Sequence, residues 1–375
     1  MKAKKILASI LAAAMALSVF SFSAFAQDIP EEEVLPDNGR PAVTTEGFDL
    51  SPVKMVDENA TPETKSLYAY LKNISKDYTL FGHQNETTNT IIKHTGIASD
   101  TYNSVGAYPG VFGYSVGETS QVIDAYEKGG IVVVEHHVNN LATGSSYGDM
   151  TNGSVAAVLP GGELHQNLVD YLDEVADFAS TLVDPDTGKL IPVIYRPWHE
   201  HNGDWFWWDT KSTTEGEIRE LFRFTVEYLR DVRGVHNFIY AFSPNGHYEN
   251  EEEYLYGYPG DEYVDLLGCD VYWDVPETNP TWFDQLIKDL RIVVNYANKT
   301  GKVAALTETG IRWDASNGLA LQDAAYGTQW YTLMRNAIME DPIAKQIAYM
   351  LVWRNGGYNH FWVPFRDDPT YGDHE

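Results

Sequence analysis

Eight short apolar runs alternate with longer stretches of helical periodicity, and this alternation limits the fold more than any other feature of the chain. The runs occupy residues 78–84, 111–116, 131–137, 191–197, 238–243, 266–273, 303–308 and 347–353. The clearest amphipathic stretches, with apolar residues three and four positions apart, are 164–182, 215–233, 282–299 and 322–340. Alternation of this kind predicts βαβ units with parallel strands. Eight such units predict a closed (β/α)8 TIM barrel of the α/β class.

An open, doubly wound sheet is the alternative arrangement of parallel strands. It is disfavoured because no glycine-rich phosphate-binding loop follows the first apolar run. The barrel has one irregularity, since Pro364, Pro369 and Gly372 follow the last run and leave no room for an eighth helix. We therefore expect the C-terminal helix to be missing from this chain. The alternative is that the N-terminal part closes the barrel.

The start of the chain has the pattern of a secretory signal peptide. A lysine-rich beginning precedes a mostly apolar core at 6–20, and Ala24-Phe25-Ala26 is typical of a cleavage site. A transmembrane anchor is disfavoured, because this core is shorter than the ~20 residues that span a bilayer. We expect a signal peptide at 1–26, an acidic linker at 27–52 and a (β/α)8 catalytic domain at 53–375. The mature protein is expected to be secreted and extracellular.

The charge of the chain restricts its partners. The formal net charge is −28, from 54 acidic and 26 basic residues. Such a protein is not expected to bind nucleic acid or, in its mature form, a membrane, and it suits a neutral substrate. Cys269 is the only cysteine, so no intramolecular disulfide is possible, and we expect it to be a buried small apolar residue. We expect the protein to act as a monomer.

The fourth apolar run leads into the stretch that most resembles a site. Arg196-Pro197 ends the run, because proline cannot donate to a sheet ladder. His199 and Glu200 follow, and then four consecutive aromatic residues at 205–208. Aromatic faces can bind the apolar faces of sugar rings. This stretch therefore indicates a functional site rather than part of the hydrophobic core, because its imidazole and carboxyl groups end a core strand and are followed by aromatic side chains that could cover them.

Polar and aromatic groups also end other apolar runs, and in a TIM barrel the ends of the strands meet at one face. These groups are His83, Glu135-His136-His137, His199-Glu200-His201, Tyr272-Trp273-Asp274, Glu308 and Trp353-Arg354. Two carboxyl groups that face each other across the open end of a barrel can form the catalytic pair of a glycoside hydrolase. A separation of ~5–5.5 Å predicts retention of configuration, and ~6.5–9.5 Å predicts inversion. The alternative for Glu308 is a structural acid in a salt bridge.

The neighbours of the two glutamates predict different roles. Trp205 and the indoles beside it would place an apolar wall next to Glu200, which raises the pKa of a carboxyl group and favours an acid. Glu308 needs hydrogen-bond donors to stay ionised, and Tyr272 and Arg354 are candidates. The sequence therefore predicts an acid on the fourth strand and a carboxylate on the seventh.

Two segments resemble the signatures of glycoside hydrolase family 26, whose best-known members are β-mannanases. They are R-P-W-H-E-H-N-G-D-W-F-W-W at 196–208 and L-T-E-T-G at 306–310. The resemblance extends from about Asp57 onward and implies a (β/α)8 retaining glycosidase, with Glu200 as acid/base and Glu308 as nucleophile. It also implies contacts to the substrate or to these glutamates by His137, His199, Trp205, Tyr272, Trp353 and Arg354.

The expected activity is cleavage of β-1,4-mannosidic bonds in mannan or glucomannan by double displacement, without a cofactor or a metal. Within the family, β-1,3-xylan or mixed-linkage β-glucan is the alternative substrate, and a non-catalytic glycan-binding barrel is an alternative from another class. A metal-dependent hydrolase could use His136-His137 and His199-x-His201. It is disfavoured because Gly203 stands where the zincin spacing requires histidine.

Overall fold

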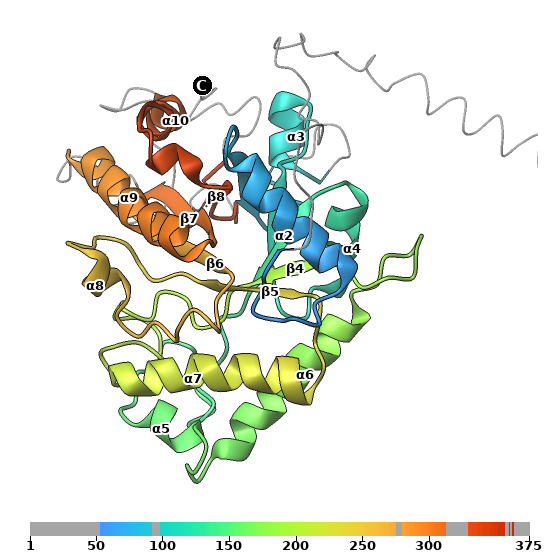
Figure 1. Cartoon of the computed structure of the whole chain (residues 1–375), viewed down its shortest axis with the longest axis vertical. Coiled ribbons are helices and arrows are strands. Elements are labelled where there is room, and N and C mark those ends of the chain that lie inside the picture. Colours follow the sequence, from blue (N-terminus) through green and yellow to red (C-terminus); the bar gives the residue numbers. More distant parts are fainter. Residues whose placement is uncertain are drawn as a thin grey trace, which may run out of the picture.

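The computed structural model describes residues 53–91, 98–274, 280–312, 329–356, 360, 362 and 363. Eight parallel strands follow one another around a closed barrel, and β8 pairs with β1 to complete it (Figure 1). The strands are β1 Leu80–Gln84, β2 Val111–Ser115, β3 Ile131–Glu135, β4 Val193–Tyr195, β5 Phe238–Phe242, β6 Leu266–Asp274, β7 Val303–Arg312 and β8 Tyr349–Val352. Each predicted run coincides with one strand, although β6 and β7 extend beyond their runs, and the predicted TIM barrel is confirmed.

Helices surround the barrel (Figure 1). They are α2 Pro62–Ile74, α3 Asp100–Val105, α4 Thr119–Glu127, α5 Ser154–Val158, α6 His165–Thr181, α7 Glu215–Glu227 with the π-helix η1 Tyr228–Val232, α8 Glu251–Tyr254, α9 Trp282–Thr300, α10 Trp330–Glu340 and the 3₁₀ helix η3 Ala344–Gln346. Three predicted amphipathic stretches match α6, α7 with η1, and α9. The fourth matches α10, with 322–328 outside the described residues, as are the predicted signal peptide and linker. No helix in the described part of the chain is long and apolar enough to cross a membrane.

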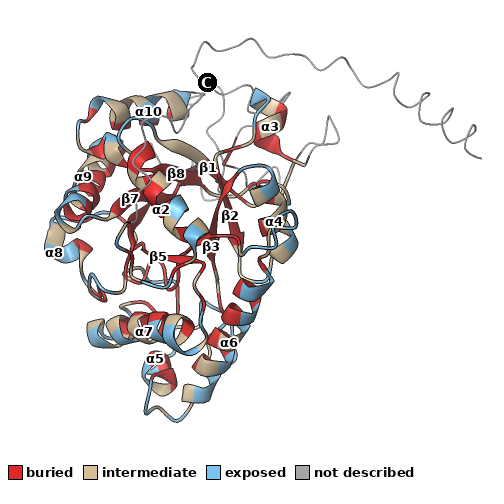
Figure 2. Cartoon of the chain, turned by 45° about the vertical axis from the view of Figure 1, so that its right-hand side comes forward, coloured by how far each residue is buried: buried red, intermediate tan, exposed pale blue. Residues whose placement is uncertain are grey.

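Successive strand residues alternate between two apolar layers. In β5, Ile239 and Ala241 belong to a cluster that includes α2, whereas Phe238, Tyr240 and Phe242 belong to a cluster that includes α6, α7 and α9. The first cluster fills the barrel, and the second lies between the strands and the outer helices. Figure 2 shows the strands buried at the centre of the molecule. Burial on both faces explains why the strands are continuous apolar runs in the sequence.

Helix α2 closes the N-terminal end of the barrel. Its residues Tyr68, Leu71 and Ile74 belong to the interior cluster. The hydroxyl of Tyr68 donates to the backbone oxygen of Asp265, just before β6, at 2.8 Å. The opposite end, where the strands finish, is the one that carries the polar groups.

The outer layer of the molecule leaves a groove beside β8 and β1, which pair with each other in the closed barrel. A groove of about 580 Å³ lies there between the strands and α10, with Phe81, Met334 and Met350 in its lining. The residues described after Val352 contain no helix. The expectation about a C-terminal helix stays a prediction.

Candidate active site

The loop after β4 holds Glu200 in an unusual backbone conformation. Trp198 and Glu200 have φ angles of 51° and 52°. This left-handed region costs a non-glycine residue ~1–3 kcal/mol, so the surroundings must hold it. The Glu200 amide donates to the Ser243 backbone oxygen at 2.9 Å, and the Trp208 indole donates to the His199 backbone oxygen at 2.9 Å. The loop is therefore fixed to β5 and to its own aromatic residues.

The four aromatic residues of this loop have two different functions. Trp205 is 38% exposed, whereas Phe206, Trp207 and Trp208 are buried. The rings of Phe206 and Trp208 stack with their centroids 4.4 Å apart. Trp207 and Trp208 donate to the backbone oxygens of Val138 and His199, so they pack the loop onto the barrel and do not form a roof over a site. Phe206 is buried but borders the site, because its ring centroid lies 5.3 Å from that of His137 and 5.1 Å from that of His199.

The carboxyl group of Glu200 is almost fully buried, with 8% of the residue exposed. Its Oε2 accepts a hydrogen bond from the Trp205 indole at 2.7 Å. Burial, followed by the charges of Glu308 and Asp270, raises the pKa of Glu200 well above its usual value. The hydrogen bond from the Trp205 indole N–H lowers the pKa of Glu200, because it stabilises the ionised carboxylate. The predicted rise in the pKa of Glu200 is confirmed, with burial as its largest cause, but neighbouring acids add to it and the Trp205 N–H opposes it.

Glu308 lies inside β7, which continues to Arg312 instead of ending at Glu308 as predicted. Its Oε2 accepts from Arg196 Nη2 at 2.5 Å, and its Oε1 accepts from the Tyr272 hydroxyl. Tyr272 was a predicted donor. The guanidinium group comes from Arg196 rather than from Arg354, which corrects the other half of that prediction. These two donors stabilise a negative charge on Glu308.

An irregularity in β7 turns Glu308 toward the site. The pairing of β6 with β7 shifts between Cys269 and Asp270, so that Thr307 is an extra residue in β7. Ala305 belongs to the interior cluster. Because side chains alternate along a strand, an unbroken β7 would point Glu308 away from the interior. The extra residue reverses the alternation and places Glu308 opposite Asp270.

Arg196 joins two carboxylates on neighbouring strands and was not predicted as a site residue. Its Nη1 lies 2.5 Å from Asp270 Oδ2, and its Nη2 binds Glu308. Asp270 also accepts a hydrogen bond from Thr307 Oγ1 at 2.7 Å. Burial raises the pKa of Asp270, and Arg196 opposes this rise. The only sequence signal for Arg196 was a charged residue at the end of an otherwise apolar strand.

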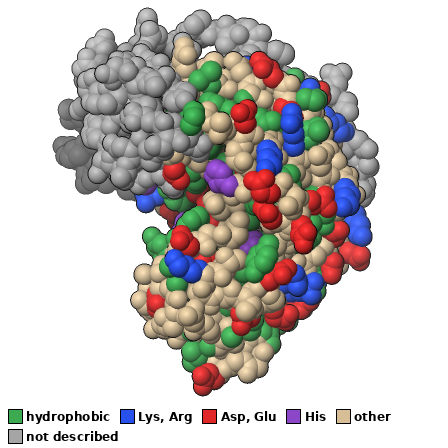
Figure 3. Space-filling view, turned by 90° about the vertical axis from the view of Figure 1, so that its left-hand side faces the viewer, with side chains coloured by type: hydrophobic (Ala, Val, Ile, Leu, Met, Phe, Trp, Pro, Cys, Tyr) green, Lys and Arg blue, Asp and Glu red, His purple; other side chains and the backbone are tan. Residues whose placement is uncertain are grey.

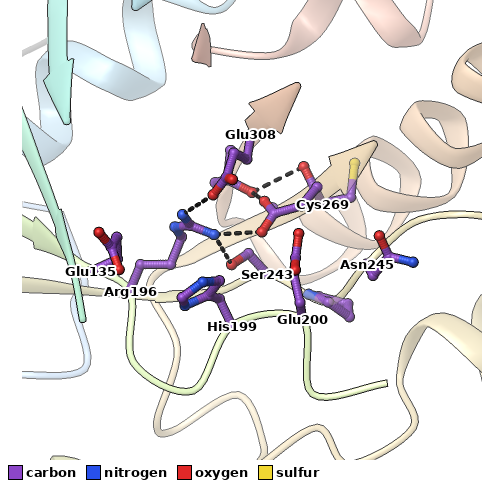
Figure 4. A network of polar contacts seen from close by, with 12 residues as sticks. Glu135, Arg196, His199, Glu200, Ser243, Asn245, Cys269 and Glu308 are labelled. Carbon is purple, nitrogen blue, oxygen red and sulfur yellow. Dashed lines mark hydrogen bonds and ion pairs between the residues drawn. The ribbon is translucent and has the colours of Figure 1, made fainter. Parts of the chain in front are cut away.

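Figure 4 shows the carboxyl groups of Glu200 and Glu308 on the same side of this network, pointing toward a shared space. The Arg196 side chain lies between β4 and the two carboxylates that it binds. The charge of Glu308 contributes to the raised pKa of Glu200, which requires the two groups to be neighbours. The site thus brings together Glu200, whose pKa is raised, and Glu308, which accepts hydrogen bonds from Arg196 and Tyr272.

Two further predicted residues, His137 and His199, lie beside this space. Their ring centroids are 5.0 Å apart, and His137 Nδ1 is 2.9 Å from Glu135 Oε2. Burial lowers the pKa of His137, but Glu135 outweighs burial and the net shift is upward. Burial, followed by the charge of Arg196, lowers the pKa of His199 well below its usual value. His199 is therefore a neutral imidazole at neutral pH.

Trp353 follows β8 and completes this aromatic group. Its ring centroid is 5.9 Å from that of His137, and the guanidinium carbon of Arg354 is 6.0 Å from the Trp353 ring. In Figure 3 the molecule is hollowed on one side, with histidine side chains at the edge of the hollow. The predicted site residues of strands three, four, six, seven and eight thus lie at the same end of the barrel.

The two histidine pairs of the metal-dependent alternative do not assemble. The ring of His136 packs against Tyr171 at 5.6 Å, and His201 Nε2 lies 2.8 Å from the Tyr256 backbone oxygen. In the described part of the chain, the residues that could hold a metal together are Glu135, His137 and His199. Only one histidine of each pair thus belongs to this group, so the two pairs do not form the ligand set that the disfavoured metal-dependent alternative would need.

Comparison with known proteins identifies the family of the chain. Residues 56–344 match the profile described as Glycosyl hydrolase family 26. The chain is 35% identical over 353 residues to a mannan endo-1,4-beta-mannosidase of Bifidobacterium adolescentis, with 86% of this chain and 34% of that protein covered. The chain thus spans about a third of the length of that relative.

Two solved structures share the fold at appreciable identity. The catalytic domain of an endo-beta-1,4-mannanase from Bacillus sp. JAMB-750 superposes with a TM-score of 0.77 at 40% identity, over 84% of this chain and 87% of that one. A modular endo-beta-1,4-mannanase from Cellulomonas fimi gives 0.78 at 38% identity, over 84% and 74%. The chain belongs to glycosyl hydrolase family 26.

Proposed function

We propose that the protein is a retaining endo-β-1,4-mannanase that acts as a monomer on a neutral polysaccharide outside the cell. The observation that carries this proposal is the pair of unlike carboxyl groups at the site. Glu308 is bound by Arg196 and Tyr272, whereas Glu200 is buried with a raised pKa. The mannanase names of the relatives support the choice of mannan.

The geometry fits a double displacement. Glu308 attacks the anomeric carbon while Glu200 donates its proton to the leaving glycosidic oxygen. Formation of the glycosyl ester removes the negative charge of Glu308, which is one cause of the raised pKa of Glu200. The pKa of Glu200 then falls, so that the same group can take a proton from the attacking water. One neighbouring charge thus switches Glu200 from acid to base.

Other site residues have supporting roles in this proposal. Tyr272 and Arg196 hold the nucleophile in place. His137 and His199 contact the sugar next to the cleaved bond, Trp353 supplies the face beneath it, and Arg354 binds a neighbouring sugar.

Product analysis on mannan, glucomannan, β-1,3-xylan and barley β-glucan tests the activity and the substrate together. We expect new reducing ends and an early fall in viscosity with mannan and glucomannan. Release of reducing ends from β-1,3-xylan or barley glucan alone would contradict mannan as the substrate and support the alternative substrates. Binding to mannan without any release would leave a glycan-binding barrel. Glu308→Gln, which keeps the size of the side chain, is the matched inactive control.

Secretion rests on the signal pattern at 1–26. The full chain expressed in a secreting bacterial host is expected in the medium, with Gln27 as its first residue. Retention in the cells with an intact N-terminus would contradict this part of the proposal.

A further inference from the structure

Three side chains at the ends of β3 and β4 offer an unused set of metal ligands. One carboxylate oxygen of Glu135 and one ring nitrogen each of His137 and His199 lie within 4.8 Å of one another. The ligand atoms come from a strand end and from the fixed loop after β4. Figure 4 shows Glu135 and His199 on either side of the Arg196 side chain.

One polar atom of this cluster is buried and has no hydrogen bond among the described residues. Glu135 is 2% exposed and His199 is 1% exposed. Glu135 Oε2 pairs with His137 Nδ1 at 2.9 Å, whereas His199 Nδ1 has no partner in the described part of the chain. Buried polar atoms are normally paired, so the unpaired ring nitrogen needs an explanation. A bound cation would pair with it and with the Glu135 carboxylate.

We propose that Glu135, His137 and His199 form an inhibitory site for a divalent transition metal such as Zn²⁺ or Cu²⁺. Two imidazoles and one carboxylate are a three-ligand set of open zinc sites, in which water takes the fourth position. Ligands of a tetrahedral site lie about 3.4 Å apart for bonds of ~2.0–2.2 Å. The observed separations, from 2.9 Å to at most 4.8 Å, fall on both sides of this value. Small side-chain rotations would close the set.

The surroundings of the cluster also fit a metal. Glu135 Oε1 accepts hydrogen bonds from Ser115 Oγ at 2.7 Å and Gln84 Nε2 at 3.3 Å, and such partners orient a ligating carboxylate. The charge of Arg196 acts on all three side chains. Its guanidinium group is bound to Asp270 and Glu308, which offset its charge.

A metal at this position would block the substrate. His199 directly precedes Glu200, and His137 packs against Trp353, so a metal would occupy the space where the sugar is expected. Inhibition of mannan hydrolysis rests on the proposed function, whereas metal binding does not. We expect Zn²⁺ to raise KM without lowering kcat, and EDTA to restore the original KM.

Calorimetric titration of the untagged full chain with ZnCl₂ tests the site directly. We expect one site in the wild type and a loss of affinity of at least tenfold in Glu135→Gln and in His199→Asn. The matched control is His236→Asn, which removes a histidine that also pairs with a carboxylate, 2.7 Å from Asp57, but at the other end of the barrel. It should leave the affinity unchanged.

Two additional measurements keep the outcomes separate. Circular dichroism checks that each variant is folded, and Co²⁺ added to the wild type should give the d–d absorption of a tetrahedral site. Zinc binding that survives both substitutions, or no binding at millimolar ZnCl₂, overturns the proposal. Zinc binding at this site without mannan hydrolysis would refute the proposed function and support the metal site. Mannan hydrolysis without zinc binding would support the proposed function and refute the metal site.

Discussion

The loop after β4 and the middle of β7 carry the same residue type at nearly the same depth but in different surroundings. Glu200 is 8% exposed and Glu308 is 5% exposed. Glu308 accepts from a guanidinium group and a phenol, whereas Glu200 accepts from an indole and faces the charge of Glu308. Burial alone therefore does not describe the surroundings of either carboxyl group. The difference lies in the donors that each carboxyl group receives from its neighbours.

Replacement of Glu308 tests the charged side of this comparison and should have the largest effect. Glu308→Ala removes the nucleophile, and we expect a loss of about 10⁴-fold or more in kcat, ~5.4 kcal/mol, on polysaccharide and aryl mannoside alike. Azide should restore turnover and give the α-glycosyl azide, because it enters from the side that the carboxylate left. Glu340→Ala, an exposed acid at the end of α10, is the control and should be unchanged.

Replacement of Glu200 tests its proposed role as the general acid. Glu200→Ala should lower kcat/KM on mannan by ~10²–10⁴-fold. Aryl mannosides with good leaving groups should lose much less, because their departure needs no proton. Steady-state kinetics on both substrate types measure the difference. Equal losses on the two types would contradict the assignment of Glu200 as the acid.

Tyr272→Phe removes one donor from Glu308 and keeps the ring. A hydrogen bond to a charged group contributes ~1.5–3 kcal/mol, so we expect a fall of roughly 10- to 100-fold in kcat/KM on every substrate. Tyr248→Phe is the matched control, because the buried Tyr248 hydroxyl donates to the Pro244 backbone oxygen at 2.8 Å. It should lower the melting temperature and leave kcat unchanged. A similar loss of activity in both variants would reduce Tyr272 to a structural role.

Trp205→Phe removes the indole N–H from Glu200 and should have the smallest effect. That N–H favours the ionised carboxylate and so lowers the pKa of Glu200. Without it the pKa rises, and the alkaline limb of kcat/KM should move to higher pH by roughly one unit or less. Rate measurements across pH test this. A move to lower pH would mean that the indole raises the pKa, as a purely apolar wall would.

The sequence predicted the barrel and both glutamates because each follows from a local pattern. Strands buried on both faces give continuous apolar runs, and Glu200 and Glu308 stand directly after or within such runs. Tyr272 was predicted for the same reason. The four aromatics at 205–208 lie in a loop, where no periodicity indicates which ring turns inward.

The contacts that make the glutamates different were not predictable in the same way. Arg196 reaches Asp270 and Glu308, which are 74 and 112 positions further along the chain. Their meeting depends on the extra residue Thr307 in β7, and a strict two-residue alternation gives the wrong orientation there. The Glu135 cluster was missed similarly, since one histidine of each sequence pair turns away from it. Pairing between strands and single-residue bulges depend on tertiary packing rather than on local pattern.

The protonation of Glu200 in the free enzyme is the central claim, and carbon-13 NMR measures it directly. Protein labelled at the glutamate carboxyl carbon is titrated, and the Glu200 signal is assigned by its loss in Glu200→Gln. We predict that this carboxyl titrates well above the usual range of glutamate. In Glu308→Gln the Glu200 pKa should fall, because a neutral amide replaces the neighbouring charge. A Glu200 signal that titrates near pH 4.5 in the wild type and does not respond to Glu308→Gln would contradict the account.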